Sequence, residues 1–274
     1  MSNTMQKEGG KRMNTHSAGL RKTAPVVSVI TIVYNGGALL EGTIQSVLDQ
    51  EEAHLEYIII DGGSKDNTLD IIQRYNERID YWISEPDKGI YDAMNKGLKA
   101  ATGDYVWFMN AGDHIHGKQI LSSLFALHPN ADVYYGEANF VNEARTVLGT
   151  RSAISTRKLP EALTWHDMIY GMSVCHQSFI ARRSLVNSYD VQYRCSADIN
   201  WVIEVLKKAK TIVNTHSVLS DYLVGGFSMK QQKLAWKERW QIYNRHYGLL
   251  KNIGVSTYIV FRYALHRIRG NGNY

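Results

Sequence analysis

The chain has 274 residues, 44% of them hydrophobic and 21% charged, a composition that excludes a largely disordered protein and suits one large α/β domain or two small ones. Its net charge of +5 is concentrated at the two ends, where it would suit an anionic ligand, an anionic membrane surface, nucleic acid or simply solvent. The sequence shows no apolar signal-peptide core near its start and no run of about 18 apolar residues, so we expect a soluble or peripheral protein.

Residues 1–24 are polar and aperiodic, which predicts a disordered N-terminal segment. From Val26 onward, short apolar runs alternate with segments of helical periodicity. The predicted strands are residues 26–34, 57–60, 81–84 and 105–109. The predicted helices are residues 39–50, a segment that starts at Asp66 or Asn67, and residues 90–101. This alternation predicts an α/β fold with a Rossmann-like, mostly parallel sheet that is flanked by helices.

Each of these four strands ends in polar or glycine-rich residues. The four ends are Asn35-Gly36, Asp61-Gly62-Gly63-Ser64, Glu85-Pro86-Asp87-Lys88-Gly89 and Asn110-Ala111-Gly112-Asp113. In parallel α/β sheets, ligands bind at the carboxyl ends of the strands. We therefore expect the four ends to line one crevice.

The second half of the chain is less regular. Residues 132–140 and 146–153 predict a hairpin, residues 176–181 a short strand, residues 196–208 a helix, residues 211–223 an extended segment, and residues 230–269 two helices. We expect this half to extend the sheet.

Three of the strand ends carry residues that suit an anionic ligand. Asp61 precedes two glycines that let a ligand approach the backbone, although a capped strand-to-helix turn would use the same residues. Asp113, with Asn110 three residues earlier, offers oxygen ligands for a hard divalent cation, although an ordinary polar turn is the alternative. Lys88 stands at a helix start, where free N–H groups favour an anion, although a basic first turn is common.

Four segments together resemble the motifs of family-2 glycosyltransferases, in the same order and spacing. They are Val29–Asn35, Ile60–Thr68, Asp87–Gly97 and Phe108–Asp113. The resemblance covers residues 25 to about 115 closely and about 170 to 228 more loosely, and it points to bacterial capsular or exopolysaccharide transferases of the colanic-acid type. It implies a GT-A fold, a nucleotide-sugar donor that family frequency makes a UDP-sugar, an inverting transfer, and a divalent cation such as Mg²⁺ or Mn²⁺.

The resemblance also implies roles for individual residues. It places Tyr34, Asn35 and Asp61 near the base and ribose of the donor, and Asp113 at the family's acidic metal motif. Many members carry two or three aspartates where this chain has Asn-Ala-Gly-Asp, which weakens the expected cation site. The other donor-binding residues that the resemblance implies are Gly62, Lys88, Asn95, Asn110 and His176.

For the catalytic base, the resemblance points to Asp198, which opens a predicted helix and would take the proton from the acceptor hydroxyl. The alternative is an acidic residue that the helix dipole favours in any first turn. His176 would contact the diphosphate or the acceptor, or would be a structural histidine. Gly225–Ser228 resembles the loop that closes over the site in relatives.

The predicted C-terminal helices are both aromatic and basic, which suits a membrane interface or a helix pair packed on the domain. The resemblance implies a saccharide or polyprenyl-linked saccharide acceptor, a role in bacterial surface polysaccharide synthesis, and no nucleic acid partner. Cys175 and Cys195 lack metal-ligand spacing, which favours a reducing compartment. We therefore expect a cytoplasmic protein, with peripheral attachment to the inner face of the cell membrane as an option.

The predicted organisation is a disordered segment (1–24), a glycosyltransferase domain (25–228) whose donor half is 25–115 and acceptor half 116–228, and a helical tail (229–274). Two alternatives stand beside a glycosyltransferase. A nucleotidyltransferase or nicotinamide enzyme would use a similar sheet, but the Gly-x-Gly-x-x-Gly and phosphate-loop patterns are missing. A non-catalytic nucleotide-sugar-binding protein would keep the fold, and the shortened metal motif suits it.

Overall fold

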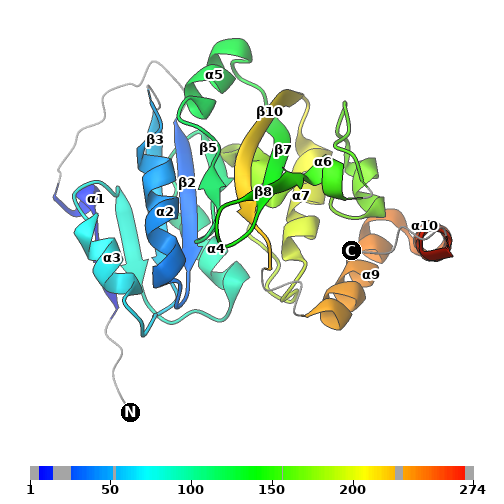
Figure 1. Cartoon of the computed structure of the whole chain (residues 1–274), viewed down its shortest axis with the longest axis horizontal. Coiled ribbons are helices and arrows are strands. Elements are labelled where there is room, and N and C mark those ends of the chain that lie inside the picture. The colour runs from blue at the N-terminus through cyan, green and yellow to red at the C-terminus, as the bar shows by residue number, and fades with distance from the viewer. Residues whose placement is uncertain (1–5, 15–25, 52–53, 156, 226–230, 269–274) are drawn as a thin grey trace.

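The computed structural model describes residues 6–14, 26–51, 54–155, 157–225 and 231–268, and within them a ten-stranded sheet carries helices on both faces (Figure 1). The strands are β1 (Lys7–Gly9), β2 (Val27–Val33), β3 (Leu55–Asp61), β4 (Tyr81–Ser84), β5 (Tyr105–Phe108), β6 (His114–Ile115), β7 (Val133–Val141), β8 (Val147–Thr150), β9 (Phe179–Arg182) and β10 (Ile212–Leu223). The α-helices are α1 (Lys11–Asn14), α2 (Gly37–Leu48), α3 (Thr68–Arg74), α4 (Ile90–Ala100), α5 (Ile120–Leu127), α6 (Arg151–Ile154), α7 (Ala197–Lys208), α9 (Gln232–Tyr247) and α10 (Leu249–Ile268). Short 3-10 helices span Trp165–Tyr170, His176–Ser178 and Arg183–Leu185.

The direction of the strands places six strand ends at one edge of the sheet. The order is β1-β4-β3-β2-β5-β9-β7-β10-β6, and β8 pairs with β7. β4, β3, β2 and β5 are parallel to one another. Because β9 is antiparallel to both β5 and β7, β7 runs parallel to β5, and β10 runs parallel to β7. The predicted α/β fold is confirmed, and the carboxyl ends of β7 and β10 join the four predicted ends at the same edge.

Two apolar layers form the core, one on each face of the sheet. Successive residues of a strand point to opposite faces. Ile30 and Ile58 accordingly pack with α4 and α7, while Val29 and Ile59 pack with α2, α3 and α5. All seven residues of β2 are buried, as a continuous β-branched run predicts. At Gly97 of α4, a Cβ would lie 2.4 Å from Cγ2 of Ile30, so the missing side chain lets α4 approach the sheet closely.

The predicted disorder over residues 1–24 is wrong for the part that the structure describes. Lys7–Gly9 pair antiparallel with β4, and Lys11 forms an ion pair of 3.0 Å with Asp80. The polar composition of this segment does not reveal its order, because the order comes from pairing with the exposed edge of a distant strand. The rest of residues 1–24, and residues 226–228 of the predicted closing loop, lie outside the described residues.

In the second half, the predicted hairpin is confirmed as β7 and β8. Its second strand ends at Thr150 rather than at Ala153, because Thr150 caps the helical turn Arg151–Ile154 by accepting from the N–H of Ala153. His176–Ser178 form a 3-10 turn before β9, not the start of the predicted strand. The two predicted C-terminal helices are confirmed as α9 and α10. Over the described ranges, every helix is too short or too polar to cross a membrane.

Candidate active site

The turns after β2 and β3 are tied to each other. The N–H of Asn35 donates to Oγ of Ser64 at 2.7 Å, and Oδ1 of Asn35 accepts from the N–H of Lys65 at 2.8 Å. Asn35 has a φ of 48°, in the left-handed region that asparagine tolerates better than most residues. Asn35 therefore fixes the position of the two turns relative to each other.

Asp61 is the last residue of β3 and holds the neighbouring turns in place through hydrogen bonds. Its side chain is fully buried and accepts hydrogen bonds from Oγ of Ser64 at 2.5 Å and from Oγ of Ser84 at 2.6 Å. These bonds join the end of β3 to the end of β4. The carboxylate of Asp61 does not face open space in this structure, so a contact with the base or ribose stays a prediction.

An exposed ring and a bare stretch of backbone lie beside Asp61. Tyr34 is 62% exposed. A Cβ on Gly62 would lie 3.4 Å from Cδ2 of Tyr34 and 2.2 Å from Oδ2 of Asp87, so the three residues lie together. A flat, exposed ring of this kind can stack on a nucleobase. Glycine is needed at position 62 because the side chain of Asp87 occupies the space that a Cβ would take.

We expect Tyr34→Ala to weaken the binding of UDP by about tenfold, because stacking of a base on an aromatic ring contributes about 1–3 kcal/mol. Isothermal titration calorimetry measures this loss directly. Tyr170→Ala is the matched control, since Tyr170 is a tyrosine of similar exposure (46%) on another part of the surface. A Tyr34→Ala affinity equal to that of the control would exclude stacking on this ring.

The start of α4 carries Lys88 at the site edge, whereas Asn95 points elsewhere. Lys88 is exposed, and its N–H donates to Oδ2 of Asp92 at 3.0 Å. The amide of Asn95 donates to the carbonyl of Tyr189 at 2.9 Å and accepts from the N–H of Tyr189 at 2.7 Å. Both groups of the Asn95 amide therefore hold the segment after β9, and the structure gives no support to its predicted donor contact.

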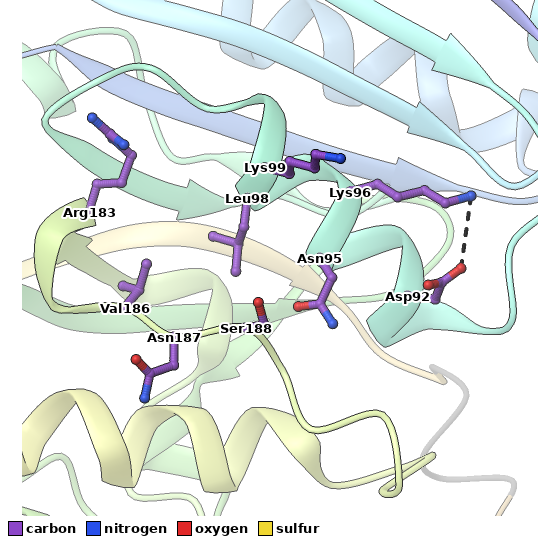
Figure 2. Close-up of a pocket in the computed structure, with 9 residues that line it drawn as sticks. All are labelled: Asp92, Asn95, Lys96, Leu98, Lys99, Arg183, Val186, Asn187 and Ser188. Atoms are coloured by element: carbon purple, nitrogen blue, oxygen red, sulfur yellow. Dashed lines mark ion pairs between the residues drawn. The ribbon is translucent and has the colours of Figure 1, made fainter.

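Asn95 also lines a hollow of about 530 Å³ beside α4 (Figure 2). The residues that line this hollow come from α4 and from the segment that follows β9: Asp92, Asn95, Lys96, Leu98, Lys99, Arg183, Val186, Asn187 and Ser188. Asp61, Asp113 and Asp198 are not among them. The hollow is therefore distinct from the strand ends that carry the candidate site.

The turn after β5 holds a buried carboxyl group. Asp113 is only 4% exposed, and it accepts hydrogen bonds from the N–H of Leu223 at 2.9 Å and from Nε2 of Gln177 at 2.9 Å. Burial raises the pKa of Asp113 to about 7, against the effect of these two bonds and of the Arg145 guanidinium. In the same turn, the N–H of Asp113 donates to the carbonyl of Asn110, and Oδ1 of Asn110 is buried without a hydrogen-bond partner among the described residues.

Asn110 and Asp113 fit a cation whose remaining ligands come from a bound phosphate. Mg²⁺ is commonly held by one or two carboxylates together with substrate phosphates and water. The unpartnered Oδ1 of Asn110 and the carboxylate of Asp113 supply two hard oxygens. Within the described ranges, no group of three or more His, Cys, Asp or Glu side chains could hold a metal by itself. Both oxygens of Asp113 also accept hydrogen bonds within the protein, so the described residues by themselves do not complete a cation site.

Asp198 lies in the first turn of α7, beside the start of α4. Its Oδ1 accepts from the hydroxyl of Tyr91 at 3.1 Å and from the N–H of Ile199 at 2.9 Å. Its side chain is half-buried, and its Oδ2 makes no hydrogen bond to the described residues. Because Tyr91 belongs to the first turn of α4, Asp198 lies next to the helix start that carries Lys88.

Asp198 and Asp113 act electrostatically on the same two side chains. Burial raises the pKa of Cys175 to about 12, and the carboxylates of Asp113 and Asp198 both contribute to this increase. Burial likewise raises the pKa of Tyr222, and the same two carboxylates reinforce the shift. Cys175 and Tyr222 are thus within electrostatic reach of both carboxylates. Contacts between side chains link the same two carboxylates. Tyr91, which donates to Asp198, stacks on Tyr189 with 5.6 Å between ring centroids, and the hydroxyl of Tyr189 lies 2.8 Å from Nε2 of His176. Gln177, the neighbour of His176, donates to Asp113.

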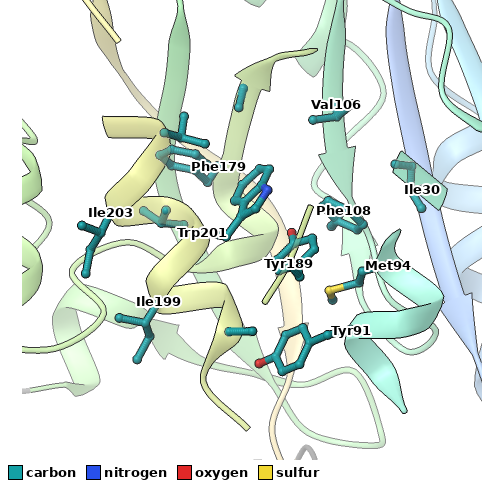
Figure 3. Packing of buried hydrophobic residues seen from close by; sticks show 14 of the residues in the cluster. Ile30, Tyr91, Met94, Val106, Phe108, Phe179, Tyr189, Ile199, Trp201 and Ile203 are labelled. Atoms are coloured by element: carbon teal, nitrogen blue, oxygen red, sulfur yellow. The ribbon is translucent and has the colours of Figure 1, made fainter. Parts of the chain in front are cut away.

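An aromatic cluster lies behind this site (Figure 3). Tyr189 stacks on Trp201 with 5.1 Å between ring centroids, and Phe108 meets Trp201 edge-on at 6.0 Å. His176 is buried among these rings, and its Nε2 lies 2.8 Å from the hydroxyl of Tyr189. Burial lowers the pKa of His176, so the ring is neutral at physiological pH. These contacts favour the structural histidine over a ligand to diphosphate.

Sequence reasoning did not identify Arg145, Gln177 or Tyr222 as part of this site. Gln177 holds Asp113, Tyr222 lies within reach of both carboxylates, and Arg145 adds a positive charge near Asp113. The sequence does not reveal the direction of β7 and β10, and this direction decides where Arg145 and Tyr222 lie. Once β7 is known to run parallel to β5, the turn that follows it must lie at the edge that carries Asp113.

Comparisons with known proteins identify the family of this chain. The profile of glycosyl transferase family 2 matches residues 28–189. An uncharacterized glycosyltransferase of Mycobacterium tuberculosis is 42% identical over 101 residues, which cover 36% of this chain and 38% of that relative, so the match spans well under half of the relative. TuaG of Bacillus subtilis, named for teichuronic acid biosynthesis, is 30% identical over 225 residues, covering 80% of this chain and 87% of TuaG.

Solved structures share the GT-A type of fold. S. aureus TarS in complex with UDP-GlcNAc superimposes with a TM-score of 0.59 at 21% identity, covering 80% of this chain and 64% of that one. The mannosyltransferase PcManGT from Pyrobaculum calidifontis, in complex with GDP-Man and Mn²⁺, gives 0.58 at 14% identity, covering 92% and 77%. At such identities the likeness concerns the fold alone. Because the family profile spans more than half of the chain, and TuaG is similar over most of it, the chain belongs to glycosyl transferase family 2.

Proposed function

We propose that the protein transfers a sugar from a UDP-sugar to a saccharide or lipid-linked saccharide acceptor in the synthesis of a bacterial surface polysaccharide. The observation that carries this proposal is the run of contacts that links Asp198, beside the start of α4, to Asp113 through Tyr91, Tyr189 and the His176-Gln177 segment. One carboxylate near the diphosphate, a second near the acceptor, and a helix start that favours anions are the groups that such a reaction requires.

The choice of donor and acceptor is supported by the names of similar proteins. The TarS structure holds UDP-GlcNAc, whereas the PcManGT structure holds GDP-Man, so UDP-sugars are the first donors to test and GDP-sugars the second. TuaG is named for teichuronic acid biosynthesis, which supports a surface polysaccharide as the product. The family match counts against the nucleotidyltransferase and nicotinamide alternatives.

The proposed reaction is a single displacement. The acceptor hydroxyl oxygen attacks the anomeric carbon, its proton passes to Oδ2 of Asp198, and the bond from that carbon to the diphosphate oxygen breaks. The nucleoside diphosphate leaves with the electron pair of that bond, and the anomeric configuration inverts. Tyr91 and the N–H of Ile199 hold Oδ1 of Asp198, which leaves Oδ2 to face the acceptor.

The leaving diphosphate is stabilised at the other end of the site. Asn110 and Asp113 would hold a divalent cation, which neutralises charge on the diphosphate when it is bound. Lys88 and the free N–H groups at the start of α4 attract the same negative charge. Tyr34 and Gly62 would receive the base, at a distance from the reacting atoms.

A donor-hydrolysis assay tests the proposal. The protein is incubated with a panel of UDP- and GDP-sugars with Mg²⁺ or Mn²⁺, and release of the nucleoside diphosphate is measured for wild type, Asp113→Ala and Asp198→Ala. We expect turnover of at least one donor by wild type, and losses of at least about 100-fold in both variants. Wild-type turnover no greater than that of the variants, with intact donor binding, would instead support a non-catalytic binding protein.

We also propose that α9 and α10 rest on the inner surface of the cell membrane, where a lipid-linked acceptor would be held. Apolar side chains are exposed on both helices, among them Trp236 at 58% and Leu250 at 86%. Lys233, Lys237 and Lys251 are exposed on the same two helices. Exposed rings and aliphatic groups among lysines suit the boundary between anionic headgroups and acyl chains.

We expect the double substitution Trp236→Ser and Leu250→Ser to reduce binding to phosphatidylglycerol-containing vesicles by at least about tenfold, because two large apolar side chains would lose their burial in lipid. Co-sedimentation with vesicles measures this change. Val147→Ser is the control, because Val147 is an apolar residue of the β8 edge that is 55% exposed. Equal sedimentation of the double variant and wild type would contradict a membrane role for these helices.

A further inference from the structure

The hairpin turn between β7 and β8 places one side chain over the site edge. The N–H of Arg145 donates to the carbonyl of Asn142 at 2.9 Å, and Oδ1 of Asn142 accepts from the N–H of Thr146 at 2.9 Å. Arg145 has a φ of 62°, a left-handed conformation that is unfavourable for a long side chain. The turn is therefore closed in a way that fixes the position of Arg145 at some conformational cost.

This turn lies beside Asp113. It follows the carboxyl end of β7, where Val141 pairs with Leu223 of β10. The N–H of Leu223 in turn donates to Oδ1 of Asp113 at 2.9 Å. The guanidinium of Arg145 acts electrostatically on Asp113, Asp221 and His114, so it extends from the turn toward the residues around Asp113.

One nitrogen of the guanidinium has no hydrogen-bond partner among the described residues. Nη1 of Arg145 is buried and makes no hydrogen bond to the described residues. Among those residues, no carboxylate lies within 4 Å of Arg145 to form an ion pair, although Asp113 and Asp221 are close enough to favour its charge. A buried N–H group without an acceptor is unfavourable, and more so when it belongs to a charged group. Such a group is suited to an acceptor that arrives with a ligand.

One chemical class of ligand would satisfy both Arg145 and Asn110. Arg145 offers donors that lack an acceptor, and Oδ1 of Asn110, in the turn of Asp113, is an acceptor that lacks a donor. A diphosphate that carries a divalent cation has both kinds of group. Its oxygens accept from guanidinium in the bidentate geometry that arginine favours, and its cation coordinates amide oxygen.

We propose that Arg145 is a diphosphate-binding residue that donates hydrogen bonds to the phosphate oxygens of the nucleotide and supplies positive charge to the leaving group. This inference rests on the proposed function. The short Asn-Ala-Gly-Asp motif has a single aspartate and would stabilise the negative charge of the leaving diphosphate only in part. The inference assigns another part of this stabilisation to the β7–β8 turn. Arg145 thereby serves the donor side of the reaction from the half of the chain expected to bind the acceptor.

The test compares the binding of UDP, uridine and pyrophosphate, each with Mg²⁺, to wild type, Arg145→Asn and Arg145→Lys. Asparagine tolerates the left-handed backbone, so Arg145→Asn removes the guanidinium without adding strain to the turn. Lys99→Gln is the control for loss of one positive charge, since Lys99 is exposed at the separate hollow of Figure 2. Unfolding temperatures of all variants confirm that each one is folded.

We expect Arg145→Asn to weaken UDP and pyrophosphate binding by at least about tenfold and to leave uridine binding unchanged, with partial recovery in Arg145→Lys. A UDP affinity of Arg145→Asn within about twofold of the Lys99→Gln control would overturn the inference. Equal losses for UDP and uridine would also overturn it, because they would indicate a disturbed site rather than a lost phosphate contact. If wild type itself bound neither UDP nor GDP, the proposed function would fail before the role of Arg145 came into question.

Discussion

Asp198→Asn is expected to lower kcat by about 10²–10⁴-fold, the usual contribution of a general base. The amide keeps the shape of the side chain and still accepts from Tyr91 and from the N–H of Ile199, but it cannot take a proton. We therefore expect the KM for the donor to change little, because Asp198 faces the acceptor in the proposed reaction. Steady-state kinetics with a saccharide acceptor measure both quantities.

The control for this substitution is Glu204→Gln, which makes the same chemical change farther along α7. Glu204 hydrogen-bonds to Asn187 and Asn200 and takes no part in the proposed chemistry. We expect kcat of Glu204→Gln to stay within about twofold of wild type, since surface substitutions of this kind have small effects. A kcat for Asp198→Asn that is also within that range would show that another group accepts the proton.

Asp113→Asn is expected to reduce activity and, in the absence of ligands, to stabilise the protein at neutral and alkaline pH. The pKa of Asp113 is raised by burial from 3.8 to about 7, so folding favours the protonated form. The associated stability is fully present below pH 3.8 and is lost as the pH rises through 7. An amide does not ionise, so the variant does not lose this stability. Its oxygen can still accept from the N–H of Leu223, and its NH2 requires the amide of Gln177 to present its oxygen instead of its NH2. With that rearrangement, the gain over wild type at pH 8 is about 2–4 kcal/mol.

The same substitution removes the charged ligand of the proposed cation and is expected to lower kcat by at least about 100-fold. Urea unfolding at pH 4.5 and pH 8 measures the stability difference. Asp132→Asn is a control for which the change in stability should have the opposite sign. The pKa of Asp132 is lowered despite partial burial, by hydrogen bonds from the N–H groups of Lys210 and Thr211 and by the ion pair with Arg182. We expect Asp132→Asn to lose stability at pH 8. An Asp113→Asn variant that is less stable than wild type at pH 8 would contradict the cause given for the raised pKa.

The strands and helices of the first half could be predicted closely because local chemistry specifies them. A β-branched run such as Val27–Val33 has few alternatives to a buried strand, and Gly89 marks the start of α4. The order of β2, β5, β9 and β7 could not be predicted, because pairing between distant segments leaves no local signal. β1 was missed for the same reason, since its three residues are ordered only by contact with β4.

The site residues divide along a similar line. Asp113 follows a predicted strand and Asp198 opens a predicted helix, and contacts through Tyr91, Tyr189 and the His176-Gln177 segment link these two ends in the fold. The elements that carry Asp61 and Asn95 were also predicted correctly, but the polar groups of these two residues and of His176 are used inside the protein. Asp61 accepts from Ser84, and both Asn95 and His176 hydrogen-bond to Tyr189. Whether a polar atom faces a ligand or a neighbouring turn depends on packing that the sequence pattern does not contain. Arg145 could not be identified, because its role depends on the direction of β7.

A crystal structure of the protein with a non-hydrolysable UDP-sugar and Mn²⁺ tests the central claim most directly. We predict that the diphosphate lies within hydrogen-bond reach of Arg145, with Mn²⁺ between it and Asp113, and that the anomeric carbon faces Oδ2 of Asp198. A nucleotide seated in the hollow of Figure 2, against Asn95, Lys99 and Arg183, with Asp113 and Asp198 free of ligand, would contradict the assignment of the site.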